Sequence, residues 1–255
     1  MSDDTSDETV ELVHYRVEDA IGTITLDSSS NRNALSRRLL TGLFDALTAA
    51  SSDESRVVVI RSADRVFCSG ADLSEAASGG MEEGTKALVE LQRLILTHPK
   101  PVVVRLAGPV RAGGLGIVAS ADVAICSDDV TFAFTEARLG LAPAVISLTV
   151  LPRMTSRGAY DTFLTGRGFD AAEAASMGLV TRSVPADRLD AEIDQVCSDL
   201  MEAHPQGIAE TKALLARDLL DRIERHGYDM CSLSARLFAS DGAREAMTRF
   251  LERRK

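Results

Sequence analysis

The feature that most constrains the fold is the order in which apolar runs, glycine-bearing loops and helical stretches follow one another in the first half of the chain. Residues 57–60 (VVVI) form a continuous apolar run typical of a buried strand, and a loop with Gly70 and a helical stretch over 85–96 follow it. Residues 101–106 (PVVVRL) repeat the arrangement, with the glycine-rich loop 108–116 leading into another apolar segment. This alternation predicts an α/β fold.

Two further patterns flank these repeats. Residues 10–16 and 20–26 are rich in β-branched side chains on either side of a charged turn, which predicts a hairpin. Residues 36–50 carry leucines at helical spacing behind a serine that can cap a helix. Beyond Ser147 the periodicity is helical, broken only at 180–184, so we expect helices that pack on the core or on another subunit.

These patterns divide the chain into three parts. Residues 1–8 (MSDDTSDE) are acidic with almost nothing to bury, which predicts a disordered tail. Residues 9–195 hold the alternating pattern and form the expected α/β core. Residues 196–255 form the expected helical region, with separate helices at 205–220 and 221–238. The length of 255 residues suits one large domain with such an appendage.

Composition and charge exclude several classes of protein. Hydrophobic residues make up 45% and charged residues 26%, which is too apolar for a disordered chain. The net charge of -10 argues against binding nucleic acid or an anionic membrane surface, because both attract clustered Lys and Arg. No apolar stretch reaches the roughly 18 to 20 residues of a membrane span, and the N-terminus is acidic, so a cytoplasmic location is predicted. Four scattered cysteines without C-x-x-C spacing predict free thiols and no metal site.

Two glycine loops could carry chemistry. Residues 67–73 (FCSGADL) run from a strand into a small-residue loop, which either frees backbone N–H groups to donate or only makes a tight turn. In the loop 108–116 (GPVRAGGLG), Gly114 begins a formal match to the dinucleotide fingerprint G-x-G-x-x-A, on which a nucleotide-dependent oxidoreductase would rest. The match comes late in the chain and five residues after Gly108, so the plainer interpretation is a helix N-terminus that stabilises a developing anion.

A third segment, residues 135–140 (TEARLG), places Glu136 directly after the apolar Phe132 and Phe134. Glu136 is either an ordinary first-turn glutamate with Thr135 as its helix cap, or a general acid/base whose pKa is raised by apolar surroundings. The segment alone leaves both interpretations open.

In order and spacing, these three segments resemble the enoyl-CoA hydratase/isomerase, or crotonase, superfamily. The resemblance extends to 164–166, to 171–180 (AAEAASMGLV) and to 245–255 (EAMTRFLERRK), and so covers nearly the whole chain after the tail. It implies a crotonase-like spiral of repeated ββα units with a helical C-terminal region that forms homotrimers or homohexamers. It implies no cofactor beyond the coenzyme A of the substrate.

The resemblance also implies roles for particular residues. Members of the family bind acyl-CoA thioesters and hold the thioester carbonyl between two backbone N–H groups, here those of Ala71 and Gly113. Such donors stabilise the enolate that forms beside a thioester. Glu136 matches one of two glutamates that act in hydratases of the family. The other position is Gly116 in this chain, and Ala144 stands where a dehalogenase branch carries an aspartate.

Contacts to coenzyme A are implied for the loop 31–35 (NRNAL), for the loop around Ala71 and for the C-terminus. Arg32 is either a phosphate partner or a solvated loop charge. Phe250 and Arg253 match positions that reach the adenine and phosphates of a neighbouring subunit, and their alternatives are helix packing and a solvated end. The implied substrate contacts are Arg32, Asn33, Ala34, Leu35, Ser69, Asp72, Leu73, Gly116, Phe250 and Arg253.

The missing glutamate leaves the reaction open between three alternatives. One base supports a 1,3-proton shift, so Glu136 alone could run a Δ3,Δ2-enoyl-CoA isomerase. Glu136 could also both position a water and deliver the proton in a hydration. We therefore predict an enoyl-CoA hydratase/isomerase-type enzyme of fatty acid metabolism. A catalytically retired acyl-CoA binder is the third alternative.

Overall fold

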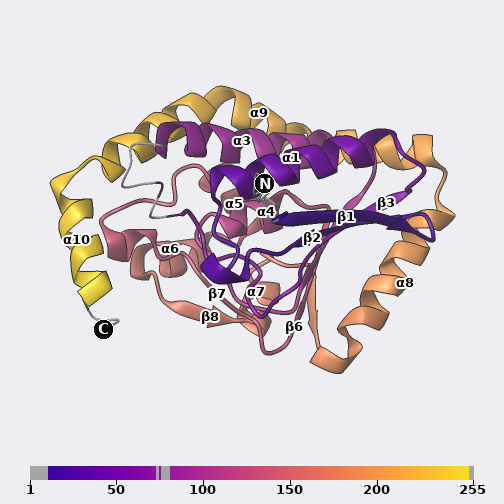
Figure 1. Cartoon of the computed structure of the whole chain (residues 1–255), viewed down its shortest axis with the longest axis horizontal. Coiled ribbons are helices and arrows are strands. Elements are labelled where there is room, and N and C mark those ends of the chain that lie inside the picture. The colour runs from indigo at the N-terminus through magenta and orange to yellow at the C-terminus, as the bar shows by residue number, and fades with distance from the viewer. Residues whose placement is uncertain (1–10, 73–74, 76–80, 253–255) are drawn as a thin grey trace, which may run out of the picture.

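A computed structural model of the chain describes residues 11–72, 75 and 81–252, and shows two sheets surrounded by helices (Figure 1). In the larger sheet, with strand order β1-β2-β3-β4-β6-β9, β1 and β2 are antiparallel and the other neighbours are parallel. In the smaller sheet, β7 lies between a parallel β5 and an antiparallel β8. The strands are β1 (Val13–Glu18), β2 (Ile21–Leu26), β3 (Val57–Ser62), β4 (Val102–Leu106), β5 (Val110–Arg111), β6 (Val123–Ser127), β7 (Thr131–Ala133), β8 (Gly168–Asp170) and β9 (Arg182–Val184).

The helices pack on both faces of the larger sheet, and the helices nearest the C-terminus extend beyond it (Figure 1). The α-helices are α1 (Arg37–Ser52), α3 (Met81–Thr97), α4 (Gly114–Ser120), α5 (Ser147–Arg153), α6 (Ser156–Thr165), α7 (Ala171–Ser176), α8 (Leu189–Glu202), α9 (Pro205–Phe238) and α10 (Asp241–Glu252). Three 3-10 turns are described as well: η1 (Ser29–Asn31), η2 (Glu136–Leu139) and η3 (Ala186–Arg188).

The apolar run of β3 is continuous because both faces of the sheet are covered. Val58 and Ile60 pack into the large core with the leucines of α1 and α3. Val57 and Val59 point the other way, into a second cluster with Leu189 and other residues of α8. Parallel strands covered on both sides have this pattern, so the predicted buried strands and the α/β class are confirmed.

Local signals near the N-terminus are also confirmed. Strands β1 and β2 form the predicted hairpin, and its turn uses left-handed backbone at Asp19 and Ala20. Ser36 caps α1, because its side-chain oxygen accepts a hydrogen bond of 3.3 Å from the backbone N–H of Leu39.

The C-terminal half differs from the prediction in two places. The structure joins 205–220 and 221–238 into the single helix α9, because Pro205 lies in its first turn and no glycine or proline separates the two halves. It also adds the short strand β8, which pairs with β7. The helix α9 lies along α3, and the Lys212 ammonium fixes it to the sheet through a 2.7 Å ion pair with Asp122.

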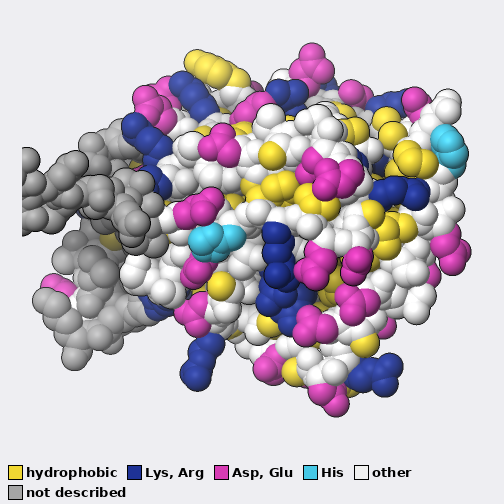
Figure 2. All heavy atoms as spheres, turned by 45° about the vertical axis from the view of Figure 1, so that its right-hand side comes forward, with side chains coloured by type: hydrophobic (Ala, Val, Ile, Leu, Met, Phe, Trp, Pro, Cys, Tyr) yellow, Lys and Arg dark blue, Asp and Glu magenta, His cyan; other side chains and the backbone are white. Residues whose placement is uncertain are grey.

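The predicted free thiols are also found, since Cys68, Cys126, Cys197 and Cys231 are buried and unpaired. Within the described residues, no helix combines the length and apolarity that crossing a membrane requires. Figure 2 shows a face on which acidic side chains surround a short column of basic ones.

Candidate active site

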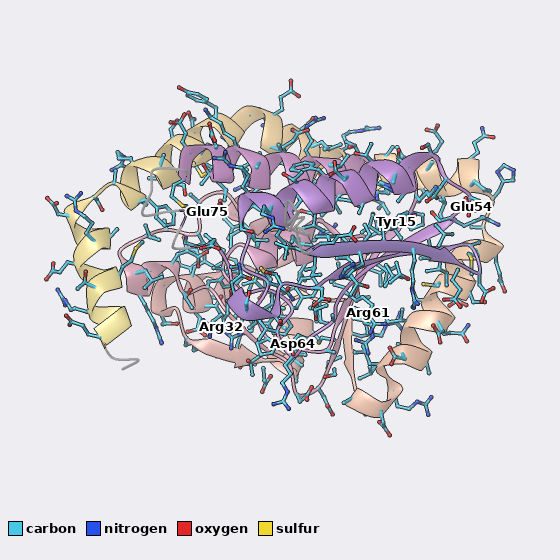
Figure 3. All side chains as sticks on the ribbon, in the orientation of Figure 1. Tyr15, Arg32, Glu54, Arg61, Asp64 and Glu75 are labelled. Carbon is cyan, nitrogen blue, oxygen red and sulfur yellow. The ribbon has the colours of Figure 1, made fainter. Side chains whose placement is uncertain are left out.

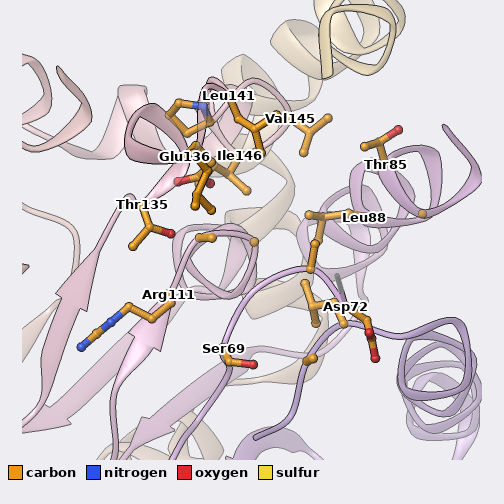
Figure 4. A pocket seen from close by; sticks show the side chains of 18 of the residues that line it. Ser69, Asp72, Thr85, Leu88, Arg111, Thr135, Glu136, Leu141, Val145 and Ile146 are labelled. Carbon is orange, nitrogen blue, oxygen red and sulfur yellow. The ribbon is translucent and has the colours of Figure 1, made fainter. Parts of the chain in front are cut away.

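A cavity of about 780 Å³ lies between the loops that follow the strands, the first turns of α3 and the end of α9 (Figure 4). It joins segments that are far apart in the sequence. In Figure 4, Glu136 lies across the pocket from Ser69 and Asp72. The lining residues come from segments 30–35, 66–75, 81–88, 109–113, 135–146 and 234–238.

Glu136 is one of the carboxyl groups that line this cavity. The strand β7 positions it, since Phe132 stacks on Phe169 and Phe134 packs on Phe163 just before the chain turns into η2. Its Oε2 is fully shielded from solvent and has no hydrogen-bond partner among the described residues. Burial raises the pKa of Glu136 from 4.5 to about 7, although a hydrogen bond from its own backbone N–H acts in the opposite direction.

These properties separate the two interpretations of Glu136. Thr135 makes no side-chain cap bond to η2, so the segment is not an ordinary capped helix start. A carboxyl group that lines a cavity and has a pKa near 7 can both take up and release a proton at neutral pH. The helix α10 packs against η2, and Gly140 lies so close to Gly242 that an added β-carbon would be 2.9 Å from the Gly242 carbonyl oxygen.

The predicted pair of amide donors lies on two loops that are hydrogen-bonded to each other. Arg111 N–H donates to the Cys68 carbonyl at 2.9 Å, and Leu35 N–H donates to the Gly70 carbonyl at 2.8 Å. Gly70 makes the turn with a φ of 98°, a conformation that favours glycine. These bonds hold the Ala71 loop beside the start of α4.

Neither the Ala71 N–H nor the Gly113 N–H donates to another described residue, and both residues line the cavity. A β-carbon added to Gly113 would lie 4.0 Å from the Ala71 nitrogen and 2.9 Å from Leu35 Cδ1, so a side chain there would occupy the space in front of the amides. Two free amides beside one another can stabilise an oxyanion that forms between them.

The loop 31–35 is bonded to the same structure. Ser69 N–H donates to the Arg32 carbonyl, and Ser69 Oγ donates to the Asn31 carbonyl, both at 3.1 Å. Asn31 Nδ2 donates to Asp72 Oδ2 at 3.3 Å. Arg32, in left-handed backbone just after η1 (Figure 3), lines the cavity, so the proposed coenzyme A loop and the amide loop form one rim.

Most of the site residues predicted from the sequence line this cavity. They are Arg32, Ala34, Leu35, Ser69, Ala71, Asp72, Gly113 and Glu136. Asn33 lies behind the wall, fully buried, with Oδ1 accepting from Ser28 N–H and Nδ2 donating to the Val66 carbonyl. Phe250 lies in α10, and its side chain is outside the described part of the structure. Leu73 and Arg253 lie outside the described residues altogether.

Gly116 is buried inside α4 and is not among the residues that line the cavity. A β-carbon added there would lie 2.9 Å from Ile146 Cγ2 and 3.3 Å from Gln92 Cδ. A β-carbon added to the neighbouring Gly114 would lie 2.6 Å from Cys68 Cβ. The glycines of the formal dinucleotide match therefore serve close packing within the core.

Gln92 is a site-forming residue that the sequence analysis missed. It is fully buried, its Nε2 donates to the carbonyls of Leu88 and Val145, and its Oε1 accepts from Thr149 Oγ1 at 2.6 Å. It thus joins α3, α5 and the cavity wall at Val145. The available signal was a glutamine on the otherwise apolar stripe of the helical stretch 85–96.

No cluster of His, Cys, Asp and Glu that could hold a metal ion is found in the part of the chain that the structure describes. Two other carboxyl groups, Asp72 and Glu75, line the cavity on the side of the loop 31–35.

The fold and this cavity define a protein of the crotonase class. The family model for enoyl-CoA hydratase/isomerase matches residues 16–255, so the chain belongs to that family. It is 32% identical to the enoyl-CoA hydratase domain-containing protein 3, mitochondrial, of Mus musculus over 96% of this chain and 83% of the relative.

Solved structures agree with this assignment. An enoyl-CoA hydratase from Mycobacterium avium is 42% identical, with a TM-score of 0.90 over 96% of this chain and 97% of that one. An enoyl-CoA hydratase from Mycobacterium smegmatis is 27% identical, with a TM-score of 0.78 over 95% and 96% of the two chains. The predicted crotonase fold is therefore confirmed, and the chain is similar to enzymes described as hydratases.

Proposed function

We propose that the protein is an enoyl-CoA hydratase in which Glu136 performs both proton transfers. The observation that carries the proposal is the unpartnered, shielded oxygen of Glu136 in the same cavity as the two free amides of Ala71 and Gly113. The names of the relatives support hydration as the reaction.

The chemistry follows from these groups. The thioester carbonyl oxygen of a 2-enoyl-CoA accepts hydrogen bonds from the Ala71 and Gly113 amides. The ionised Glu136 takes a proton from a water molecule as the water oxygen bonds to C3, and the electrons of the double bond move to form an enolate held by the two amides. Glu136 then returns the proton to C2, so one carboxyl group completes the addition of water.

Isomerisation is the second candidate, because Gly116 leaves the cavity without the second glutamate of the hydratase pattern. In that reaction Glu136 removes a proton from C2 of a 3-enoyl-CoA and returns it to C4, with the same enolate intermediate. No water adds, so the mass of the product equals that of the substrate. A retired acyl-CoA binder would keep the cavity and turn nothing over.

For coenzyme A we propose contacts from the loop 31–35, with Arg32 as the phosphate partner, and from Phe250 and Arg253 of a neighbouring subunit. This arrangement needs a trimer or a hexamer. Exposed apolar side chains support such an assembly, since Leu215 and Tyr228 on α9 are 78% and 80% exposed. The cytoplasmic location stays a prediction.

The test incubates the purified protein with trans-2-enoyl-CoA and trans-3-enoyl-CoA of several chain lengths, and identifies products by mass and chromatography. Glu136→Gln is the active-site variant, and Glu202→Gln, on the exposed end of α8, is its matched control. A water adduct that is lost only in Glu136→Gln supports the hydratase. A change in retention without a change in mass supports the isomerase, and tight binding without turnover contradicts both.

A further inference from the structure

One end of the cavity carries a polar group that the proposed reaction does not use. Ser234 of α9 lines the cavity there and is 6% exposed. Its neighbour one turn earlier, Cys231, is hydrogen-bonded to Thr85 of α3, which places Ser234 beside the first turns of α3. Figure 4 shows Thr85 at the end of the pocket away from Glu136, with Val145 between them in this view.

The Ser234 hydroxyl has no hydrogen-bond partner among the described residues. Other helical hydroxyls in this protein donate to the carbonyl four residues earlier, as Ser120 does to Gly116 at 2.7 Å and Thr211 does to Gly207 at 2.7 Å. Ser234 makes no such bond. The Ser234 hydroxyl thus lines the cavity without a partner among the described residues, so it is free to bond to a ligand atom there.

The surroundings of Ser234 define what that ligand atom can be. The lining residues on the same helices as Ser234 and Thr85 include the apolar Met81, Leu88 and Phe238. The Thr85 hydroxyl donates to the Glu82 carbonyl at 2.9 Å and keeps a lone pair to accept a further bond. Two hydroxyls in an apolar setting suit a neutral oxygen and disfavour a carboxylate or an ammonium group.

We propose that Ser234 is a specificity-determining residue whose hydroxyl binds a hydroxyl or carbonyl oxygen on the acyl chain, so that the preferred substrates are acyl-CoA esters with an oxygen-bearing chain. The inference rests on the proposed function for the reacting end of the substrate. It adds a second polar contact to the substrate, on the acyl chain and far from the thioester.

The test compares matched enoyl-CoA substrates of increasing length, each with and without a terminal hydroxyl. In the wild-type protein, kcat/KM for the hydroxylated ester exceeds that for the plain ester by about tenfold or more at the length that reaches Ser234. Ser234→Ala brings this ratio to one or below. Ser232→Ala, on the exposed face of the same helix, leaves it unchanged. Equal ratios in wild type and Ser234→Ala at every length overturn the proposal.

A binding measurement separates this inference from the proposed reaction. Calorimetry with saturated acyl-CoA and hydroxyacyl-CoA esters, on wild type, Ser234→Ala and Ser234→Cys, needs no turnover. A hydroxyl preference that depends on Ser234 supports the inference even if no enoyl-CoA is hydrated. Turnover of plain enoyl-CoA without any such preference overturns the inference and leaves the proposed function intact. Ser234→Cys keeps the size of the side chain with weaker hydrogen bonding, so it also lowers the preference, and it replaces Ser234→Ala if that variant does not fold.

Discussion

At the scale of single residues, Glu136 titrates near neutral pH without help from a charged neighbour. Loss of solvent around its carboxyl group is the main cause, and the backbone hydrogen bond that it accepts only partly offsets that loss. Its pKa of about 7 therefore depends on apolar packing around η2, including the phenylalanines before it.

The first prediction concerns the pH dependence of activity. Both proposed reactions begin with ionised Glu136, so kcat/KM should rise about tenfold per pH unit below neutrality and level off above a pH of about 7. A pH profile of kcat/KM on a slow substrate checks this. A profile that stays flat through neutral pH contradicts the assigned role.

The second prediction concerns stability. The folded pKa is raised above the unfolded value, so stability is complete below pH 4.5 and falls as pH rises toward 7, where the unfolded chain ionises first. Glu136→Gln removes this loss and should be more stable than wild type by roughly 3 kcal/mol at most above pH 7. Urea unfolding of both proteins at acidic and slightly alkaline pH measures the difference, which should vanish at the acidic value.

Sequence patterns were sufficient to locate the Glu136 segment and the two glycine loops, because a carboxyl group after aromatic residues and glycines after buried strands are visible locally. The patterns left the roles of these residues open, and the structure places them around one cavity. Gln92 and Ser234 could not be predicted in this way. Each gains its significance from a contact with a distant element, Gln92 with Val145 and Ser234 with the first turns of α3. In the sequence, such a contact shows only as a polar residue on the apolar face of a predicted helix.

At the scale of elements, α3, α4 and α5 meet where Gln92 packs on Gly116. The space that a glutamate side chain at position 116 would enter is therefore already occupied, because the amide of Gln92 and Ile146 fill it. A side chain introduced there has to displace a bonded group of the core.

The third prediction follows from this packing. Gly116→Glu should lower the free energy of unfolding by about 1–3 kcal/mol or more, because the new side chain overpacks the core. Gly116→Glu combined with Gln92→Ala should recover part of that loss. Urea titration of the two single variants and the double variant forms the cycle, and strictly additive losses would show that the two positions do not compete for space.

The fourth prediction concerns how α9 is attached to the sheet. The Lys212 ammonium bonds both Asp122 and the Lys100 carbonyl while it is 7% exposed. Lys212→Met should cost about 1–3 kcal/mol, because it leaves the Asp122 carboxylate without its cation, although Val102 N–H still donates to it. Lys212→Met with Asp122→Asn should cost less than the sum of the two single changes. Thermal unfolding of the three variants, with the exposed Arg217→Met as control, measures this.

At the scale of the whole molecule, continuous apolar runs and glycine loops made the α/β class and the strands of the larger sheet predictable. The break at Leu220 was predicted wrongly because α9 is stabilised by packing on α3 and α5, which local periodicity does not reveal. The strand β8 was missed because three residues carry almost no pattern, and its pairing with β7 decides its structure.

The fifth prediction concerns assembly. Light scattering at micromolar concentration should give three or six times the chain mass of 27.3 kDa. Leu215→Glu or Tyr228→Glu should weaken the assembly, because each replaces an exposed apolar side chain of α9 with a charge. The matched control is Arg217→Glu on the same helix. A monomer in the wild-type protein would contradict the trimeric proposal.

The packing of α10 on η2 has a consequence for how the protein is made. The helix that covers the segment bearing the acid/base is the last of the described helices to leave the ribosome, whereas Glu136 itself is translated midway through the chain. A nascent chain can thus build its sheets and amide loops before the cover of η2 exists. The packing of α10 on η2 is completed only at the end of synthesis, so chains that terminate before α10 should fold in large part and yet lack this cover.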